Sequence, residues 1–289
     1  MSLRLEMLQV ARLAPSLLGE AAASVRAFLQ QQFGSDGGAC DRFGASDLYY
    51  TVFALDGLVA LQADLPNAEV VPYLESFGAG DDLDLVHLAC LARCRTAVGV
   101  DDSKVEAIVA NLAGFRNADG GFAPEVGDES TVYHSFLGLG AYQDLGVECP
   151  DSPAIAVCVA ARRAADGGYA NQPGLPVGST SVTAAAVTLL RYLGHDMTGE
   201  VADWLLARAN ADGGFHASPQ APLPDLLSTA TAIHALAGVH VDLAPVQESC
   251  LDFVDSLWTG QAFCGHWADD AKDSEYTFYA LLALGHLSL

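Results

Sequence analysis

A short glycine-rich sequence recurs along the chain at regular intervals. Residues 117–122 read Asn-Ala-Asp-Gly-Gly-Phe, and related copies lie at 165–169 and 210–215, with a partial copy at 35–38. The last three copies are spaced by roughly 46 residues, a period typical of chains built from stacked copies of one supersecondary unit. Because paired glycines readily adopt positive φ, each copy predicts a turn that ends a helix, and the aromatic residue after it is expected to pack between units.

Six helix–turn–helix units account for nearly the whole chain, after a short leading helix. Apolar residues at three- and four-residue steps predict the two helices of each unit. In the first unit these helices lie at 19–33 and 47–61, and in the second at 69–77 and 82–97. The remaining units run over residues 102–145, 152–193, 198–237 and 244–287.

The second helix of each unit is predicted to start at a residue that caps helix N-termini. These caps are Asp47, Asp82, Thr131, Ser179, Asp225 and Asp273. Four residues later stand small or β-branched residues, suited to close helix packing, namely Thr51, Val86, Ser135, Thr183, Thr229 and Thr277. The position before them varies and reads Tyr50, Leu85, His134, Val182, Ser228 and Tyr276. The repeated caps indicate structure, whereas the variation beside them indicates a site.

The two helices of a unit differ in charge. The second helices are rich in alanine, threonine and glycine, while the first helices carry more charged residues. The less charged set is therefore expected to form an inner ring and the other set an outer ring. Six parallel inner helices would form an all-α barrel with every helix N-terminus at one rim, in a single domain that spans residues 1–289.

The chain is strongly acidic, which limits its partners. Its formal net charge is −23 at pH 7. Such a charge repels phosphate backbones and anionic lipid headgroups, which argues against nucleic acid and is compatible with a basic partner, with solubility alone as the alternative explanation. Seven cysteines without a CxxC pair indicate reduced thiols of a cytoplasmic protein. Charged residues interrupt the N-terminal segment, which resembles neither a secretory signal nor a membrane span.

These features together resemble a known family. The Gly-Gly-aromatic turns, and the motif Asp-x-x-aromatic-Thr at 47–51 and 273–277, resemble the prenyltransferase and squalene-cyclase repeat family. The likeness is greatest to β subunits of protein prenyltransferases, especially type II geranylgeranyl transferase. It covers about the whole chain and implies an α6/α6 toroid of six helix hairpins, whose central apolar funnel holds an isoprenoid. It also raises an α-type subunit as a partner, with a homo-oligomer as the alternative.

The family's zinc ligands can be compared with this chain one by one. The Asp corresponds to Asp225, but the Cys position holds Leu227 and the His position holds Tyr276. One carboxylate cannot hold zinc alone, so we expect no metal cofactor. Cys264 and His266 are the nearby candidates to replace the lost ligands, although their spacing fits no standard zinc pattern.

The family's phosphate-binding cations are also missing. The loop at 216–224, where the family places an Arg and a Lys, contains neither. A bound diphosphate would therefore need Mg²⁺ or a partner to supply positive charge.

The candidate site residues follow from these alignments. As catalytic residues, Asp225 and Tyr276 belong to a transferase-like site. Asp82 and Asp84 would instead supply the acid of a cyclase-like site, with helix capping as the structural alternative. The residues expected to bind substrate are Tyr50, His134 and Asp273 at the rim, Phe53, Tyr133 and Phe278 in the funnel, and Trp267 at its mouth.

Core packing is the alternative for each aromatic residue and for His134, and it is the expectation for His87 and His234, which lie deeper along their helices. Three functions therefore stay open. The chain is a prenyltransferase β-subunit-like protein, a terpene-cyclase-like enzyme that uses an acidic cluster, or a non-catalytic toroid that binds an apolar ligand or a partner.

Overall fold

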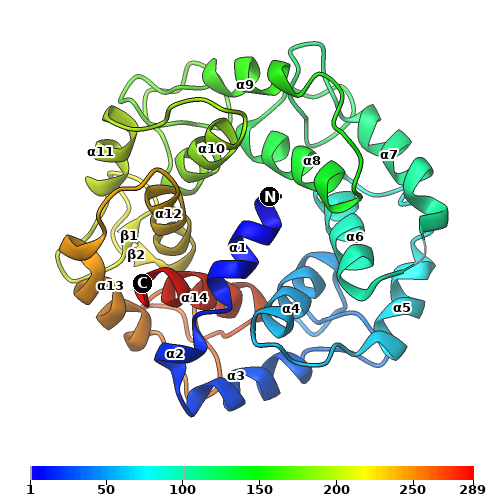
Figure 1. The fold of residues 1–289 in the computed structure, drawn as a ribbon, viewed down its shortest axis with the longest axis horizontal. Helices are drawn as coiled ribbons and strands as arrows, with labels where there is room; N and C mark the ends of the chain where they lie inside the picture. The colour runs from blue at the N-terminus through cyan, green and yellow to red at the C-terminus, as the bar shows by residue number, and fades with distance from the viewer. Residues whose placement is uncertain (1, 101) are drawn as a thin grey trace.

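Helices with few charged residues form the inner ring of the protein, and this confirms the predicted all-α toroid (Figure 1). The computed structural model describes residues 2–100 and 102–289. Each inner helix packs against the next, and the last packs against the first, so the ring is closed. The inner helices are α4 (Leu48–Ala60), α6 (Leu85–Val98), α8 (Val132–Asp144), α10 (Thr180–Tyr192), α12 (Leu226–Gly238) and α14 (Ser274–Leu287).

The first helix of each unit lies outside this ring, as the charge distribution predicts (Figure 1). The outer helices are α3 (Ala21–Gln30), α5 (Asn67–Ser76), α7 (Val105–Gly114), α9 (Ser152–Ala160), α11 (Glu200–Leu206) and α13 (Ala244–Ser256). A short 3₁₀ helix, η1 (Asp102–Lys104), precedes α7. Two short strands, β1 (Phe215–His216) and β2 (Pro224–Asp225), pair antiparallel before α12. Among the described residues, no helix is both long enough and apolar enough to cross a membrane.

The Gly-Gly turns join outer to inner helices by close packing. Gly120 has a φ of +88°, the left-handed region that favours glycine. A Cβ on Gly121 would lie 2.2 Å from the Cys158 sulfur of α9, so only glycine fits there. The aromatic residue after the turn is buried between the rings, with Phe122 and Phe215 both fully shielded from solvent. The turns and their aromatic residues are therefore as the sequence predicts.

The small residue four positions after each cap has a different role from the one expected. In the fifth unit, the Thr229 hydroxyl accepts a hydrogen bond from the Phe215 N–H at 2.9 Å and donates one to the Asp225 carbonyl at 2.7 Å. It therefore fastens the turn to the start of the inner helix. Equivalent bonds from the turn to a hydroxyl occur at Thr51, Ser135, Thr183 and Thr277. Hydrogen bonding, rather than close helix packing, explains these residues.

The predicted start of the second unit's inner helix is wrong by two residues. The cap is Asp84, not Asp82, and its Oδ1 accepts a hydrogen bond from the His87 N–H at 2.8 Å. The acidic run begins in a turn, since the Leu83 N–H bonds the Gly80 carbonyl, and Leu85 is the first helical residue and is fully buried. The variable position in this unit is therefore His87 rather than Leu85. Leu88 takes the place of a hydroxyl-bearing residue.

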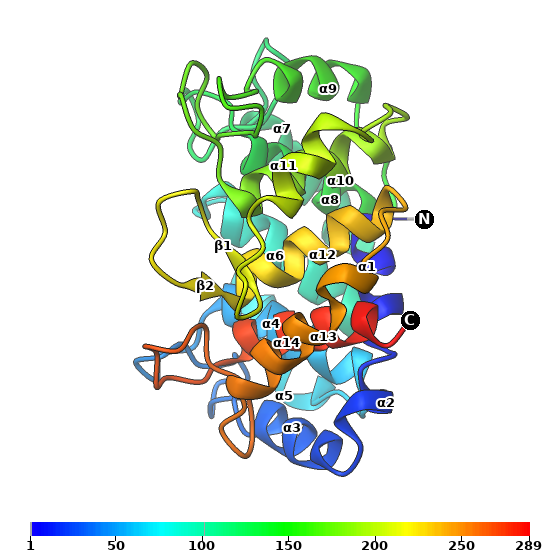
Figure 2. The same ribbon diagram turned by 90° about the vertical axis from the view of Figure 1, so that its left-hand side faces the viewer.

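The leading helix α1 (Leu3–Ala11) lies inside the inner ring, a position that the sequence does not predict (Figure 1). It packs against α4, α8, α10 and α14, and the short helix α2 (Pro15–Leu18) leads from it to α3. Both termini lie at one end of the barrel, and the β1–β2 loop lies at the other (Figure 2). We call the end that carries the inner-helix N-termini the rim, and the end closed by α1 the floor.

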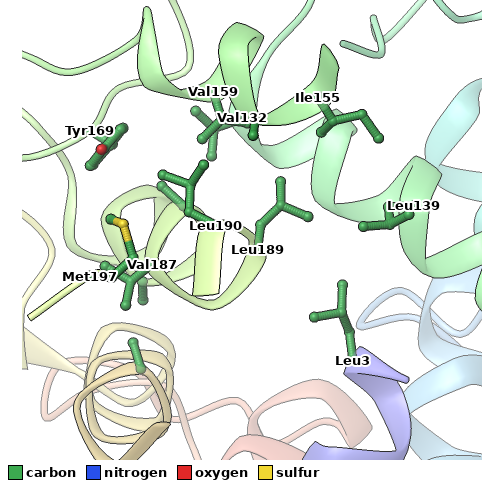
Figure 3. Close-up of a cluster of buried hydrophobic side chains, with 14 of the residues drawn as sticks. Leu3, Val132, Leu139, Ile155, Val159, Tyr169, Val187, Leu189, Leu190 and Met197 are labelled. Atoms are coloured by element: carbon green, nitrogen blue, oxygen red, sulfur yellow. The ribbon is translucent and has the colours of Figure 1, made fainter. Parts of the chain in front are cut away.

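The floor is held by buried charges and by apolar contacts. Arg4 donates hydrogen bonds through Nε and Nη2 to one Asp56 oxygen, at 3.0 and 2.7 Å. Arg93 of α6 lies 3.7 Å from the other Asp56 oxygen and 3.3 Å from Asp144. Figure 3 shows Leu3 of α1 at the edge of the apolar cluster that joins α8, α9 and α10.

Candidate functional site

A cavity of about 230 Å³ lies within the inner ring. Met7 of α1 borders it at the floor, and side chains of α4, α8, α10, α12 and α14 form its walls. A larger hollow of about 890 Å³ lies beside α9, but Asp119 and Arg162 in its lining already form an ion pair. The central cavity is the candidate site because five inner helices enclose it and most of its lining side chains are apolar.

One wall of the cavity is aromatic. It consists of Tyr49, Tyr133, Phe136 and Tyr279, contributed by three inner helices. Asn171, from the loop before α10, also borders the cavity, and its side-chain oxygen accepts a hydrogen bond from the Tyr133 N–H at 3.1 Å. Such a wall suits an apolar ligand with π electrons, because aromatic faces pack against it and also attract positive charge.

A carboxyl group lies directly behind this wall. The Tyr49 hydroxyl donates a hydrogen bond to Glu275 Oε1 at 2.6 Å. Burial raises the pKa of Glu275 to about 7, the Asp273 charge adds to the rise, and the bond from Tyr49 opposes it. Glu275 is therefore partly protonated at neutral pH. The sequence prediction did not include this pair, although both residues belong to the first turns of α4 and α14, which become neighbours only when the ring closes.

The opposite wall carries hydroxyl groups and an imidazole. Ser181 and Thr188 of α10 face the cavity together with Thr231 and His234 of α12. His234 is only 5% exposed, as expected for a core histidine, yet it also lines the cavity. Its Nδ1 lies 3.0 Å from Nε2 of His286. Burial lowers the pKa of His234 to about 4 and that of His286 to about 3, so both rings are neutral at pH 7.

The two residues predicted as a transferase-like catalytic pair lie at the rim. Asp225 caps α12, and its carboxylate accepts hydrogen bonds from the N–H and the hydroxyl of Ser228, both at 2.7 Å. Burial raises the pKa of Asp225. Tyr276 packs against Gly265, and burial raises its pKa to about 12, so it stays protonated.

Arg42 contacts several residues at the rim, and the sequence did not indicate it as a site residue. Its Nε donates to Asp273 at 2.7 Å, its Nη2 lies 2.9 Å from Asp269, and its guanidinium lies 5.3 Å from the centre of the Tyr276 ring. Burial raises the pKa of Asp273, and the hydrogen bond from Arg42 opposes the rise. Tyr50 is half-buried beside this group.

His134 lies at the rim, in the first turn of α8. Its Nδ1 is 2.8 Å from the Thr131 hydroxyl, and burial lowers its pKa. Phe53 and Phe278 are buried, with ring centres 5.9 Å apart, and Phe53 contacts the cavity residue Tyr279 at 5.4 Å. These two rings therefore support the aromatic wall from behind.

The prediction that Trp267 lies at the cavity mouth is wrong. Its indole N–H donates to the Ser256 hydroxyl at 2.8 Å, and its ring lies 5.4 Å from that of Phe253. Both partners belong to the outer helix α13. Trp267 therefore packs on the outside of the ring, because the loop that carries it folds back over α13.

The two candidate acids of the second unit have different surroundings in the structure. Asp82 is exposed, whereas Asp84 caps α6 and lies 2.8 Å from Nδ1 of His87. Nε2 of His87 lies 3.6 Å from Asp47, the cap of α4. The hydrogen bond to Asp47, helped by Asp84 and opposed by burial, raises the pKa of His87 to about 9. His87 is therefore a charged link between two rim caps, and the expectation that it packs in the core is wrong.

The residues at the family's zinc position do not fit a zinc ion. The Asp225 carboxylate is engaged by Ser228, and Leu227 supplies no ligand atom. Cys264 is buried, with a raised pKa, and Nδ1 of His266 accepts a hydrogen bond from the Ala268 N–H. Within residues 2–100 and 102–289, no group of three or more His, Cys, Asp or Glu side chains is arranged to hold a metal.

Comparison with known proteins gives matches over most of the chain. The family model of the prenyltransferase alpha-alpha toroid domain matches residues 18–79, 73–170 and 182–288. Among solved structures, type II terpene cyclase MstE from Scytonema superposes with a TM-score of 0.64 at 13% identity, over 94% of this chain and 97% of that chain. A variant of MstE in complex with geranylgeranyl dihydroxybenzoate, its substrate, gives a TM-score of 0.67 at 13% identity, over 95% and 97%.

A protein from Actinoplanes is also similar, with a TM-score of 0.62 at 14% identity, over 93% of this chain and 98% of that chain. A search of curated proteins gave no match. Similarity at this level of identity shows a shared fold.

Proposed function

We propose, because the chain belongs to the prenyltransferase alpha-alpha toroid domain family, that its central cavity binds an isoprenoid or a similarly apolar small molecule. The cavity itself supports the proposal, since aromatic and aliphatic side chains form most of its lining. Its volume of about 230 Å³ exceeds the roughly 150 Å³ of a cavity that binds benzene. The cavity volume is smaller than the roughly 300–1,000 Å³ of pockets that bind drug-sized ligands. This small volume favours a short isoprenoid as the ligand.

A cavity-filling variant tests this proposal. Ala185 faces the cavity from α10, so Ala185→Phe would occupy part of the space that a ligand needs. The matched control is Ala107→Phe on the exposed face of the outer helix α7. Titration calorimetry with farnesol should show binding to the wild-type and control proteins and weaker binding to Ala185→Phe. Equal affinity in all three proteins would place the ligand elsewhere.

A second candidate function is cyclisation started by protonation, and the pairing of Tyr49 with Glu275 favours it. A carboxyl group with a raised pKa stays protonated near neutral pH and can serve as a general acid. Tyr49 borders the cavity and its oxygen lies 2.6 Å from Glu275 Oε1. When Glu275 is protonated, its hydroxyl can donate to the Tyr49 oxygen, and the Tyr49 hydrogen is then free to move to a ligand while the proton of Glu275 replaces it. Such a cyclisation needs no co-reactant, because the proton added to the first double bond is lost from the last carbocation.

Analysis of the cyclic products shows whether Glu275 or Asp84 supplies the proton. Farnesol, a short isoprenoid of the class that the cavity volume favours, is a suitable probe. We expect the wild-type protein to form a cyclic product whose yield falls above pH 7, and Glu275→Gln and Tyr49→Phe to form little. If Asp84→Asn abolished the product while Glu275→Gln retained it, the acidic cluster at the second unit would be the proton source instead. Ligand binding without any product would favour the non-catalytic alternative.

Prenyl transfer is less favoured than cyclisation. The Asp225, Leu227 and Tyr276 positions do not supply a zinc site, and the loop between β1 and β2 has no cation to hold a diphosphate. An α-type subunit or a second copy of the chain stays a prediction, as does a cytoplasmic location. Size-exclusion chromatography with light scattering would test for self-association.

A further inference from the structure

We propose that the deep end of the central cavity selects a ligand that carries a hydroxyl group, and that His234 binds this group through Nε2. The inference rests on the proposed function, since it concerns the same cavity, and it adds a chemical class to the ligand. The ligand is then an apolar alcohol, with its hydroxyl group at the inner end.

The first observation is an unpaired polar atom. His234 is 5% exposed, and its Nε2 is buried without a hydrogen-bond partner among the described residues. An unpaired polar atom in such a place is costly, and buried polar groups in folded proteins nearly always have partners. Because the His234 side chain lines the cavity, a small shift of the groups that cover Nε2 would let a ligand in the cavity supply the missing partner.

The second observation concerns the protons of the histidine pair. Nδ1 of His234 and Nε2 of His286 are 3.0 Å apart, and both rings are neutral at pH 7. One hydrogen atom therefore lies between these two nitrogens. If His286 donates it, Nε2 of His234 carries a hydrogen and acts as a donor. If His234 donates it, Nε2 acts as an acceptor.

A hydroxyl group suits both arrangements, because it donates and accepts. A carbonyl or an ether only accepts, and a hydrocarbon does neither. A carboxylate or a phosphate would bring negative charge to a neutral imidazole. The nearby cation Arg191 is already paired with Glu6 of α1, and it does not line the cavity.

The neighbouring side chains match this chemistry. Thr188 of α10 and Thr231 of α12 border the same part of the cavity. The Thr231 hydroxyl donates to the Leu227 carbonyl at 2.7 Å, so its oxygen can still accept a hydrogen bond. The opposite wall carries the aromatic rings that suit the hydrocarbon part of the ligand.

The position of His234 sets the direction of the ligand. Leu227 borders the cavity in the first turn of α12, and His234 lies two turns further along the same face. At 1.5 Å per residue, this places His234 about 10 Å deeper than Leu227. The hydroxyl group therefore enters first, and the rest of the chain extends toward the rim and Tyr49.

A pair of probes tests the inference. Farnesol and farnesene share one carbon skeleton, and only farnesol carries a hydroxyl group. We expect the wild-type protein to bind farnesol roughly three- to tenfold more tightly than farnesene, as one net hydrogen bond allows. In His234→Phe this preference should disappear while farnesene still binds. His195→Phe, at an exposed position after α10, is the matched control and should retain the preference.

The outcomes separate the inference from the proposed function. Binding of neither probe to the wild-type protein would overturn both. Equal binding of the two probes would overturn only the inference, and Nε2 of His234 would then hold a water molecule. A preference that persisted in His234→Phe would also overturn it, since the hydroxyl group would bind elsewhere. If His234→Phe fails to fold, His234→Gln replaces it and should reduce the preference without abolishing it, because an amide also donates and accepts.

Discussion

The rim and the floor of the barrel are built in different ways. At the rim, one local arrangement recurs from unit to unit. A side chain caps each inner helix, and in five units a hydroxyl four residues later binds the preceding turn. Each of these bonds joins residues close in sequence. The caps and turns of the rim are therefore a repeated product of short-range rules.

The floor has no such repetition. It depends on α1, which belongs to no repeat, and on pairs far apart in sequence. Arg4 bonds Asp56, Glu6 pairs with Arg191, and His234 pairs with His286. The first two contacts form only when α1 lies inside the ring, and the third forms when α12 packs against α14. Because the floor sets the depth of the cavity, the part of the site that discriminates between ligands depends on unrepeated residues.

The largest expected effect comes from the buried charges of the floor. Arg4→Met leaves Asp56, which is 1% exposed, with Arg93 at 3.7 Å as its remaining cation, so the loss should approach the cost of about 3–5 kcal/mol for breaking a buried pair without exceeding it. Arg12→Met, at an exposed position after α1, is the control and should change stability little. Urea unfolding measures both. Equal stability of the two variants would mean that α1 does not depend on this pair.

A second prediction concerns the acid side of the pH range. The folded-state pKa values of His234 and His286, about 4 and about 3, lie below the value of about 6.5 for free histidine. The unfolded chain then binds more protons, so the stability contributed by these neutral rings is present above pH 6.5 and is lost as the pH falls toward 4.

The double variant His234→Phe with His286→Leu should remove this loss, because neither residue titrates. Thermal unfolding followed at pH 7 and at pH 4.5 measures the effect as the difference from the wild-type protein. If the wild-type protein and the variant lost the same stability between pH 7 and pH 4.5, the two rings would be protonated in the folded protein.

The sequence was sufficient for the caps and turns of the rim because their signals are local. The Gly-Gly turns, the caps and the charge difference between helices predict the two rings. The second unit is the exception, since it lacks the Gly-Gly-aromatic sequence and offers two acidic caps. Without a Gly-Gly turn to fix the register, the sequence favours Asp82 over Asp84 as the cap. The sequence shows the hydroxyl at Thr229 as a repeated feature, but it does not show the hydrogen bond from that hydroxyl to the turn.

The floor and the acid pair could not be predicted in this way. The contact between Tyr49 and Glu275 joins the first and last inner helices, and it requires the closed ring. The position of Arg42 depends on a loop that reaches Asp273 from the other end of the chain. The position of Trp267 in the loop before the last inner helix predicts that it lies at the mouth of the central cavity. In the structure this loop folds outward, and the Trp267 ring packs on Phe253.

The third prediction sharpens the comparison by removing one bond of the rim. Thr229→Val keeps the shape of a fully buried side chain but leaves the Phe215 N–H without its acceptor. Leaving such a donor unpaired costs about 1–3 kcal/mol. Thr231→Val is the control on the same helix, because its hydroxyl serves only carbonyl groups within that helix. If Thr231→Val destabilised the protein as much as Thr229→Val in urea unfolding, the hydroxyl would not fasten the turn.

The smallest expected effect is at His87, on the alkaline side. Its folded-state pKa of about 9 lies above the value of about 6.5 for free histidine, so its contribution to stability is fully present below pH 6.5 and is lost as the pH rises through 9. The side chain is 36% exposed, and solvent screening limits the contribution to less than about 1 kcal/mol.

His87→Gln should therefore be less stable than the wild-type protein at pH 6 and equally stable at pH 10, with added salt reducing the difference. His195→Gln, at an exposed position, is the matched control. A difference that persisted to pH 10 would mean that His87 stabilises the rim by packing, and the two ends of the barrel would then no longer differ in how they respond to pH.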